Sequence, residues 1–218
     1  MNRIFQVLKL DYLTVKSSLA RIIMIYIISI LLGMSTQPVL PVILIMFFCV
    51  SFSGLSFSIT EKNKCEKLYG ILPIRRIEVV IGRYLYGFFT GIINLIISIF
   101  ISFLIAAFTN QQIDILFLSF SITIALCYYS FAVSISYPIF YKFSFSKSFM
   151  FISLPLYLLV IVLTLLAEKT NLLDNVNLNL QYFVEHYYLF LLCGFVLSVF
   201  MLMVSAGVSY VIFRKSEL

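Results

Sequence analysis

The stretch TEKNKCEKLYGILPIRRIEVVIGR, residues 60–83, determines how the rest of the chain is interpreted. It holds nine of the 24 charged residues in the protein, whereas residues 39–59 before it and 84–113 after it carry none. A helix needs about 20 apolar residues to cross the hydrocarbon core of a bilayer. We therefore expect residues 60–83 to be a solvent-facing element held at a membrane surface between two spans.

The composition indicates that most of the surface faces lipid. The chain is 62% hydrophobic and 11% charged, whereas soluble domains carry about 25% charged residues. Its long runs of Ile, Leu, Phe and Val favour helices over the alternating segments of a β-barrel. The sequence thus predicts an all-α integral membrane protein with one domain, residues 1–218. Four cysteines without a CxxC pair, and one histidine, indicate neither a disulfide framework nor a zinc site.

Hydrophobic runs predict six membrane spans and three segments outside them. Residues 1–18 form an amphipathic helix in the headgroup region, and residues 168–187 form a short helical segment on the opposite surface. Pro138 is expected to end the fourth span, and Pro155 to kink the fifth. The apolar side of the first helix is expected at Ile4, Phe5, Leu8, Tyr12 and Val15. The predicted spans are residues 22–34, 39–59, 84–108, 115–137, 148–167 and 188–213.

The distribution of basic residues predicts the orientation. The two termini, residues 60–83 and the loop around Lys142 together hold 14 of the 15 Lys and Arg residues, and the other side holds only Lys169. Lys and Arg accumulate on the cytoplasmic side of membrane proteins. Both termini are therefore expected in the cytoplasm. Because this placement explains the net charge of +6, nucleic acid is not an expected partner.

The spans lack the residues that ion-coupled carriers and membrane hydrolases use. No Asp, Glu, Lys, Arg or His lies in their apolar interiors, although carriers often place ionisable relays there. No GxxxxGK[ST] phosphate loop is present, so the chain cannot bind ATP by that mechanism. We therefore expect no catalytic, cofactor-binding or metal-binding residue, and a separate ATPase that supplies the work.

The pattern within residues 60–83 predicts a rigid lever for that ATPase. Residues 61–69 favour a helix with Gly70 in place to end it, and residues 74–83 lead helically into the third span. We expect the charged residues to form the ATPase contact. They are Glu61, Lys62, Lys64, Glu66, Lys67, Arg75, Arg76, Glu78 and Arg83.

Two features of the third span have alternative interpretations. Gly87 and Gly91 are four residues apart, a spacing that lets membrane helices approach closely but that also arises by chance. Asn94 is the one amide inside a span. An interhelical hydrogen bond is the favoured explanation for it, and a place on the cargo path is the alternative.

Glu61 and residues 67–84, KLYGILPIRRIEVVIGRY, resemble the first cytoplasmic loop of small type-2 ABC exporter permeases. In that family an acidic residue ends the second span, and a Leu-Pro segment and a basic residue with Tyr lead into the third. Here Arg75 stands where Ser is frequent and Arg83 where Lys is frequent. The six spans, the amphipathic first helix and the polar segment between spans five and six fit the family over the whole chain. The chain is similar to exporter permeases for peptides such as the phenol-soluble modulins of low-GC bacteria.

The resemblance implies a half-transporter in the bacterial cytoplasmic membrane. Two such permeases, identical or paired with a sister subunit, pack together beneath two ABC ATPase subunits that bind ATP and Mg²⁺. Residues 60–83 then act as coupling helices and residues 168–187 line an extracellular gate. The cargo is expected to be amphipathic or hydrophobic, with a peptide favoured.

Two other functions remain as alternatives. One is a membrane scaffold or immunity protein that binds a partner and transports nothing. The other, an ion-coupled carrier, is the least favoured because the spans lack buried charges.

Overall fold

The computed structural model describes residues 2–16, 19–35, 37–62, 75–143 and 186–215, together with Phe145 and Ser148. Within these ranges every regular element is an α-helix. Most of the predicted coupling loop, fifth span and extracellular segment lies outside the described residues. The helices are α1 (Asn2–Lys16), α2 (Leu19–Ser35), α3 (Leu40–Lys62), α5 (Arg76–Thr109), α6 (Ile115–Lys142) and α10 (Tyr187–Lys215).

Helices α3, α5, α6 and α10 are long and apolar enough to cross a membrane. Helix α2 is apolar but has 17 residues, which is about 25 Å of helix and slightly short of a bilayer core of about 30 Å. Helix α5 has 34 residues, which is about 51 Å of helix, so it extends well beyond the hydrocarbon. The predicted all-helical membrane protein is confirmed at this level, with four span-length helices and one shorter helix among the described residues.

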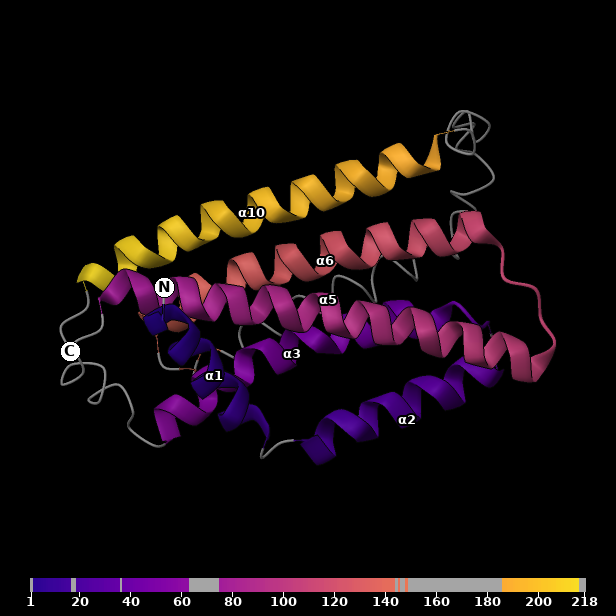
Figure 1. Ribbon diagram of the computed structural model, residues 1–218, viewed down its shortest axis with the longest axis horizontal. Helices are drawn as coiled ribbons and strands as arrows, with labels where there is room; N and C mark the ends of the chain where they lie inside the picture. Colours follow the sequence, from indigo (N-terminus) through magenta and orange to yellow (C-terminus); the bar gives the residue numbers. More distant parts are fainter. Residues whose placement is uncertain are drawn as a thin grey trace.

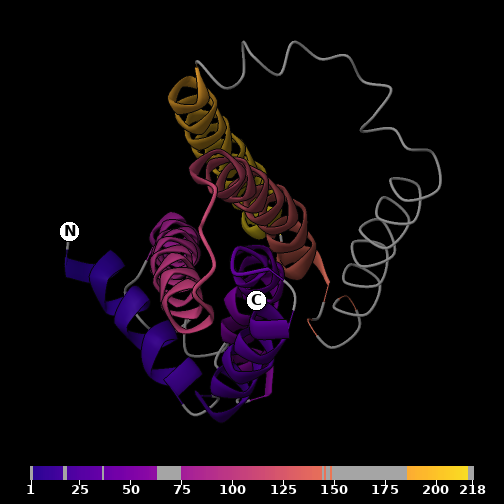
Figure 2. The ribbon, with the colours of Figure 1, turned by 90° about the vertical axis from the view of Figure 1, so that its right-hand side faces the viewer.

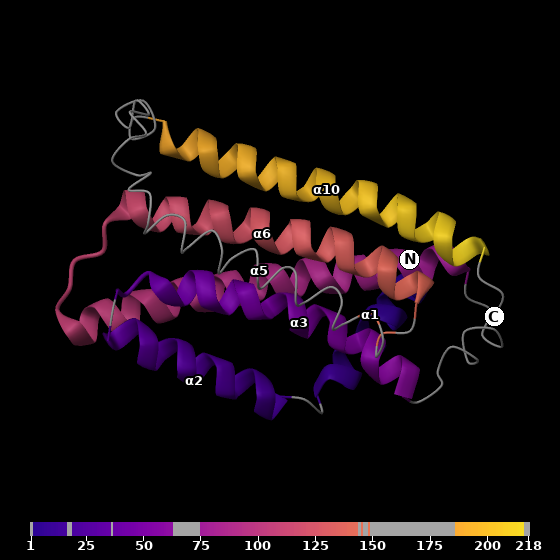
Figure 3. The ribbon, with the colours of Figure 1, turned by 180° about the vertical axis from the view of Figure 1, so that it is seen from behind.

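The helices α2, α3, α5, α6 and α10 lie side by side along the long axis, and α1 lies against them near one end (Figures 1 and 3). Figure 2 shows the same bundle from its end. Both chain termini lie at the end where α5 begins and α6 and α10 finish, which we call the termini end. The α2–α3 and α5–α6 connections lie at the opposite end, which we call the turn end.

Helices α6 and α10 pack against each other in the same direction. Their contacts advance together along both helices, which two antiparallel helices cannot do. The chain therefore leaves α6 at the termini end and enters α10 at the turn end. The contacts in order are the Phe120–Phe190 rings, Cys127 Sγ–Gly194 O, Ser134 O–Ser205 Oγ and the Tyr141–Phe213 rings.

Helix α6 does not end near Pro138, and the end of the fourth span at residue 137 stays a prediction. The helix continues through the proline to Lys142. Proline has no N–H for the carbonyl four residues earlier, which here belongs to Ser134. The Ser205 hydroxyl of α10 donates to that carbonyl at 2.7 Å. A neighbouring helix thus supplies the missing donor, which is how membrane helices tolerate proline.

Helix α1 is a helix as predicted, and the stripe that packs against the bundle shares only Val15 with its predicted apolar side. Val7, Asp11 and Val15, spaced four residues apart, form the buried stripe. Phe5 and Tyr12 are 67% and 61% exposed. The placement of the apolar side in the headgroup region stays a prediction, whereas Asp11, which was placed outside that side, is buried in the bundle near Arg83.

Candidate coupling site

Helix α5 begins inside the segment that the sequence marked as a coupling loop. The Glu78 side chain accepts a hydrogen bond from the Arg75 N–H at 2.8 Å, which satisfies a donor at the helix start. Its negative charge in the first turn also complements the helix dipole. Residues 76–83 are therefore the first turns of the same helix that forms the third span, and the helix runs unbroken to Thr109.

Arg83 joins α5 to α3 and α6. Its side chain is buried, with 5% of its surface exposed. One guanidinium nitrogen, Nη2, donates to the Thr60 hydroxyl at 3.0 Å. The guanidinium also lies 4.2 Å from the centre of the Phe57 ring and 5.7 Å from that of Tyr141. Cation–π contacts of this kind are stronger when water is excluded, so the charge is accommodated by aromatic faces within the bundle.

Asp11 brings α1 to the same place. It is fully buried, and burial raises the pKa of its carboxyl from 3.8 to about 6, while the positive charge of Arg83 opposes that rise. Gly82 allows the close approach of α1, because a Cβ there would lie 2.9 Å from the Val7 Cβ. The raised pKa means that ionising this buried carboxyl costs stability even beside Arg83, because the loss of hydration outweighs the attraction of the arginine.

Arg76 joins the start of α5 to the end of α10. Its Nη1 donates to the carbonyl oxygens of Phe213 and Arg214, at 3.2 and 2.8 Å. These carbonyls lie in the last turn of α10, where no helical N–H can reach them and where a positive charge is favourable. The Arg76 guanidinium also lies 5.9 Å from the centre of the Phe213 ring.

Tyr84 continues these contacts into the membrane. Its hydroxyl lies 2.6 Å from Ser205 Oγ and 2.8 Å from Ser209 Oγ. Because the Ser205 proton goes to the carbonyl of Ser134, Tyr84 donates to Ser205 and accepts from Ser209. The resulting chain of hydrogen bonds links α5 and α10 to the carbonyl that Pro138 leaves free on α6.

The start of α5, residues 76–84, which we call the α5 entry, thus contacts every other described helix except α2. Its contacts hold helices in place and present no nucleophile with a base. No group of three or more His, Cys, Asp or Glu side chains within the described residues could hold a metal ion. The arrangement is suited to transmitting displacement from the termini end to the bundle.

Four other predicted contact residues lie in or next to the α5 entry. Lys62 and Arg75 are exposed, and Glu61 and Glu78 are half-buried. Lys64, Glu66 and Lys67 lie outside the described residues. Arg76 and Arg83 are engaged within the chain itself. The predicted ATPase contact of these nine residues stays a prediction.

Gly87 and Gly91 lie against aromatic rings of α6. A Cβ on Gly87 would come 2.6 Å from the Tyr137 hydroxyl oxygen, and one on Gly91 would come 2.5 Å from Tyr129 Cε1. Tyr129 also donates to the Gly87 carbonyl at 2.6 Å. The absence of side chains at the two glycines therefore lets two large rings approach the α5 backbone.

Asn94 forms an interhelical hydrogen bond, which is the favoured explanation of its presence in a span. Its Oδ1 accepts from the Tyr26 hydroxyl of α2, and its Nδ2 donates to the Thr90 carbonyl at 2.7 Å. The side chain is 8% exposed. A role for Asn94 on the cargo path stays a prediction.

Sequence reasoning missed most partners of the α5 entry. Phe57 precedes the charged stretch, Thr60 is its uncharged first residue, and Tyr141 and Ser205 lie far along the chain. One pattern pointed to Asp11, because it lies four residues from both Val7 and Val15. A carboxylate in an apolar stripe indicates a buried partner of opposite charge.

Comparison with known proteins agrees with this geometry. A family model described as "ABC-2 family transporter protein" matches residues 6–214. No curated protein and no solved structure matches the chain. The match covers all the described helices apart from the first residues of α1 and the last of α10. The chain belongs to the ABC-2 family of transporter proteins, and is therefore an integral membrane permease component that associates with an ABC ATPase.

Proposed function

We propose that the chain is the permease subunit of an ATP-driven exporter that moves an amphipathic or hydrophobic cargo, with a peptide favoured, out of the bacterial cytoplasm. The observation that carries the proposal is the α5 entry. Arg76, Arg83 and Tyr84 lie on one unbroken helix, and each contacts at least one other helix of the bundle. An ATPase that pushes on the start of α5 therefore moves several helices together.

The stiffness of α5 supports coupling over distance. A continuous helix transmits a tilt along its length, whereas a flexible connector absorbs it. Helix α5 has no proline between Arg76 and Thr109. The exposed side chains of Lys62 and Arg75 lie beside the coupling segment and suit contact with a partner. Residues 60–83 are accordingly the proposed ATPase contact.

The parallel packing of α6 and α10 supports six spans. Because α6 ends at the termini end and α10 begins at the turn end, the proposed span at residues 148–167 would connect these two ends. The basic residues Lys62, Arg75, Lys142 and Arg214 belong to the termini end. Their position supports a cytoplasmic location for that end and for both termini.

The remaining components follow from the family. ABC transporters pair two membrane halves, so the proposal includes a second permease copy or a sister subunit. ATP and Mg²⁺ bind to the ATPase partner. In this proposal residues 168–187 line the outer gate, and the cargo passes from the termini end to the turn end.

Affinity purification tests the ATPase contact. The tagged full chain, solubilised from its native membranes, is expected to retain an ABC ATPase that mass spectrometry identifies. Charge reversal at Lys62 and Arg75 (Lys62→Glu with Arg75→Glu) should reduce the retained ATPase by roughly tenfold, because rim charges govern association. The matched control Lys142→Glu reverses an exposed charge at the same end outside the coupling segment. Equal retention by the double variant and the control would overturn the proposed contact.

A further inference from the structure

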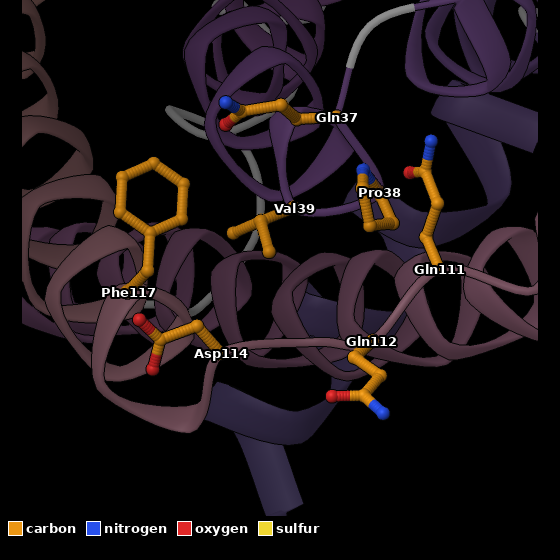
Figure 4. A pocket seen from close by; sticks show the side chains of 7 residues that line it. All are labelled: Gln37, Pro38, Val39, Gln111, Gln112, Asp114 and Phe117. Carbon is orange, nitrogen blue, oxygen red and sulfur yellow. The ribbon is translucent and has the colours of Figure 1, made fainter.

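The two connections at the turn end form a hollow of about 550 Å³ (Figure 4). Its volume falls within the range of small-molecule sites, roughly 300–1,000 Å³. Nothing in the proposed coupling mechanism uses it. The lining residues are Gln37, Pro38, Val39, Gln111, Gln112, Asp114 and Phe117.

Defined backbone geometry holds both walls of the hollow. Asn110 ends α5 in the left-handed region, with φ 53° and ψ 29°, a conformation that asparagine tolerates better than most residues. The N–H of Gln111 donates to the Ala106 carbonyl at 3.2 Å. On the other side, the N–H of Leu40 donates to the Gln37 carbonyl at 3.1 Å. The lining side chains therefore extend from capped helix ends.

The side chains of the hollow suit a positively charged group. Asp114 accepts a capping hydrogen bond from the Leu116 N–H through Oδ1 at 2.9 Å, and a carboxylate has further acceptor capacity. Phe117, three residues further along the chain, lines the same hollow (Figure 4) and offers an aromatic ring to a cation. An ammonium group can contact both at once.

The rest of the lining suits an uncharged chain attached to that ammonium. Pro38 and Val39 supply apolar surface, and Figure 4 places Gln111 and Gln112 on the side opposite Phe117. Glutamine amides both donate and accept hydrogen bonds, as peptide backbone groups require. A lipid headgroup would bring a phosphate close to Asp114, which like-charge repulsion disfavours.

The charge difference between the two ends is consistent with such a ligand. Asp114 is the one formally charged side chain among the described residues of the turn end. The charged side chains among the described residues of the termini end are mainly basic. A cationic group that leaves the termini end therefore meets a favourable potential at the hollow.

We propose that the hollow at the turn end binds a lysine or amino-terminal ammonium group of an amphipathic peptide as it leaves the transporter. The proposal rests on the proposed export function and specifies the chemistry of its cargo. The ammonium lies between the Asp114 carboxylate and the Phe117 ring, and the neighbouring peptide chain contacts Val39 and the glutamine amides.

Binding to the full chain in phosphatidylcholine nanodiscs tests the site without the ATPase. The probe is a short fluorescent peptide of leucine and lysine, and the signal from nanodiscs without protein is subtracted. The matched probe has every lysine acetylated, which removes the charge. We expect the lysine peptide to bind more tightly than the acetylated one, and equal affinities would overturn the proposal.

Substitutions then locate the site. Asp114→Ser removes the charge but retains a side chain that caps helices well, and should weaken binding roughly threefold. Phe117→Leu should also weaken binding roughly threefold. Gln112→Glu adds a second carboxylate and should strengthen binding by a similar factor. Unchanged affinity in all three variants would overturn the proposal.

Two further measurements distinguish a failure of the proposed peptide site from a failure of the proposed coupling. Complete loss of peptide binding in phosphatidylethanolamine nanodiscs would identify the ligand as a lipid amine and overturn the peptide assignment. If the purified chain retains its ATPase but does not distinguish the two peptides, the site inference fails while the proposed coupling stands. If it distinguishes the two peptides but retains no ATPase, the proposed coupling fails while the site inference stands.

Discussion

Replacing Asp11 with asparagine should make the protein more stable above neutral pH. The carboxyl is fully buried, and its pKa is about 6 rather than 3.8. Between these values the folded protein holds a proton that the unfolded chain releases. The stability contributed by the protonated carboxyl is therefore complete below about pH 4 and is lost as the pH rises through 6. Asparagine resembles the protonated form at every pH.

The size of the effect follows from the pKa rise. A change from 3.8 to about 6 corresponds to about 3 kcal/mol of stability lost between acidic and neutral pH. In a chain of this length, that is an upper limit of roughly 6–12 °C in the melting temperature. Asp11→Asn should therefore remove most of the decrease in melting temperature between pH 5 and pH 8.

Thermal unfolding in nanodiscs, followed by tyrosine fluorescence, provides the measurement. The matched control is Asp114→Asn, which removes an exposed carboxylate and retains a capping side chain. It should keep the pH dependence of the unsubstituted protein. If Asp11→Asn and the unsubstituted protein lose stability in parallel as the pH rises, the buried carboxyl is not the source of that pH dependence.

Three further substitutions test the packing of the bundle. Ser205→Ala should lower stability by about 1–2 kcal/mol. Adding Pro138→Ala should restore part of that loss, because the carbonyl that the proline leaves free regains a helical donor while Tyr84 still lacks the Ser205 acceptor. A double variant no more stable than Ser205→Ala would contradict this. Gly91→Ala should lower stability by about 1–3 kcal/mol through overlap with a tyrosine ring. The control Gly207→Ala should not lower stability, because a Cβ there has nothing within 4 Å. Equal melting temperatures of the two variants would refute the close contact at Gly91. Tyr26→Phe should lower stability by only about 0.6 kcal/mol, the average for interhelical hydrogen bonds in a membrane, and an unchanged melting temperature would count against that bond.

The membrane helices were predictable because the patterns that indicate them lie within short continuous stretches of the sequence. Uncharged runs on either side of residues 60–83 predicted the apolar parts of α3 and α5, although α3 extends to Lys62 and α5 begins at Arg76, inside the charged stretch. The glycines at 87 and 91 also indicated close packing from their spacing alone. Each of these features depends on neighbouring residues, so no knowledge of the fold was needed.

The features that the sequence did not reveal depend on residues far apart in the chain. Helix α6 passes Pro138 because a hydroxyl on α10 replaces the missing donor, and only the parallel packing of the two helices brings that hydroxyl there. Asp11 is buried because Gly82 lets α1 approach α5. The partners of Arg83 likewise come from three other helices, α1, α3 and α6.

In the proposed mechanism, the α5 entry serves both stability and coupling. A buried acid that is less stable when ionised is retained beside Arg83 although asparagine would be more stable there. Sites that move under a partner's force are often held by contacts that are not optimised for stability. The predicted pH dependence is thus a consequence of the same contacts that join α1 to α5.

The most direct test of transmission through the α5 entry is a distance measured by electron paramagnetic resonance. Spin labels at Ser35→Cys and Ile115→Cys report on α2 and α6 at the turn end, in a chain whose four native cysteines are replaced by serine. With the copurified ATPase, ATP should change this distance in the otherwise unsubstituted protein. Arg83→Gln should abolish the change while the ATPase stays bound. The same change in both proteins, or no change in either, would contradict transmission through Arg83.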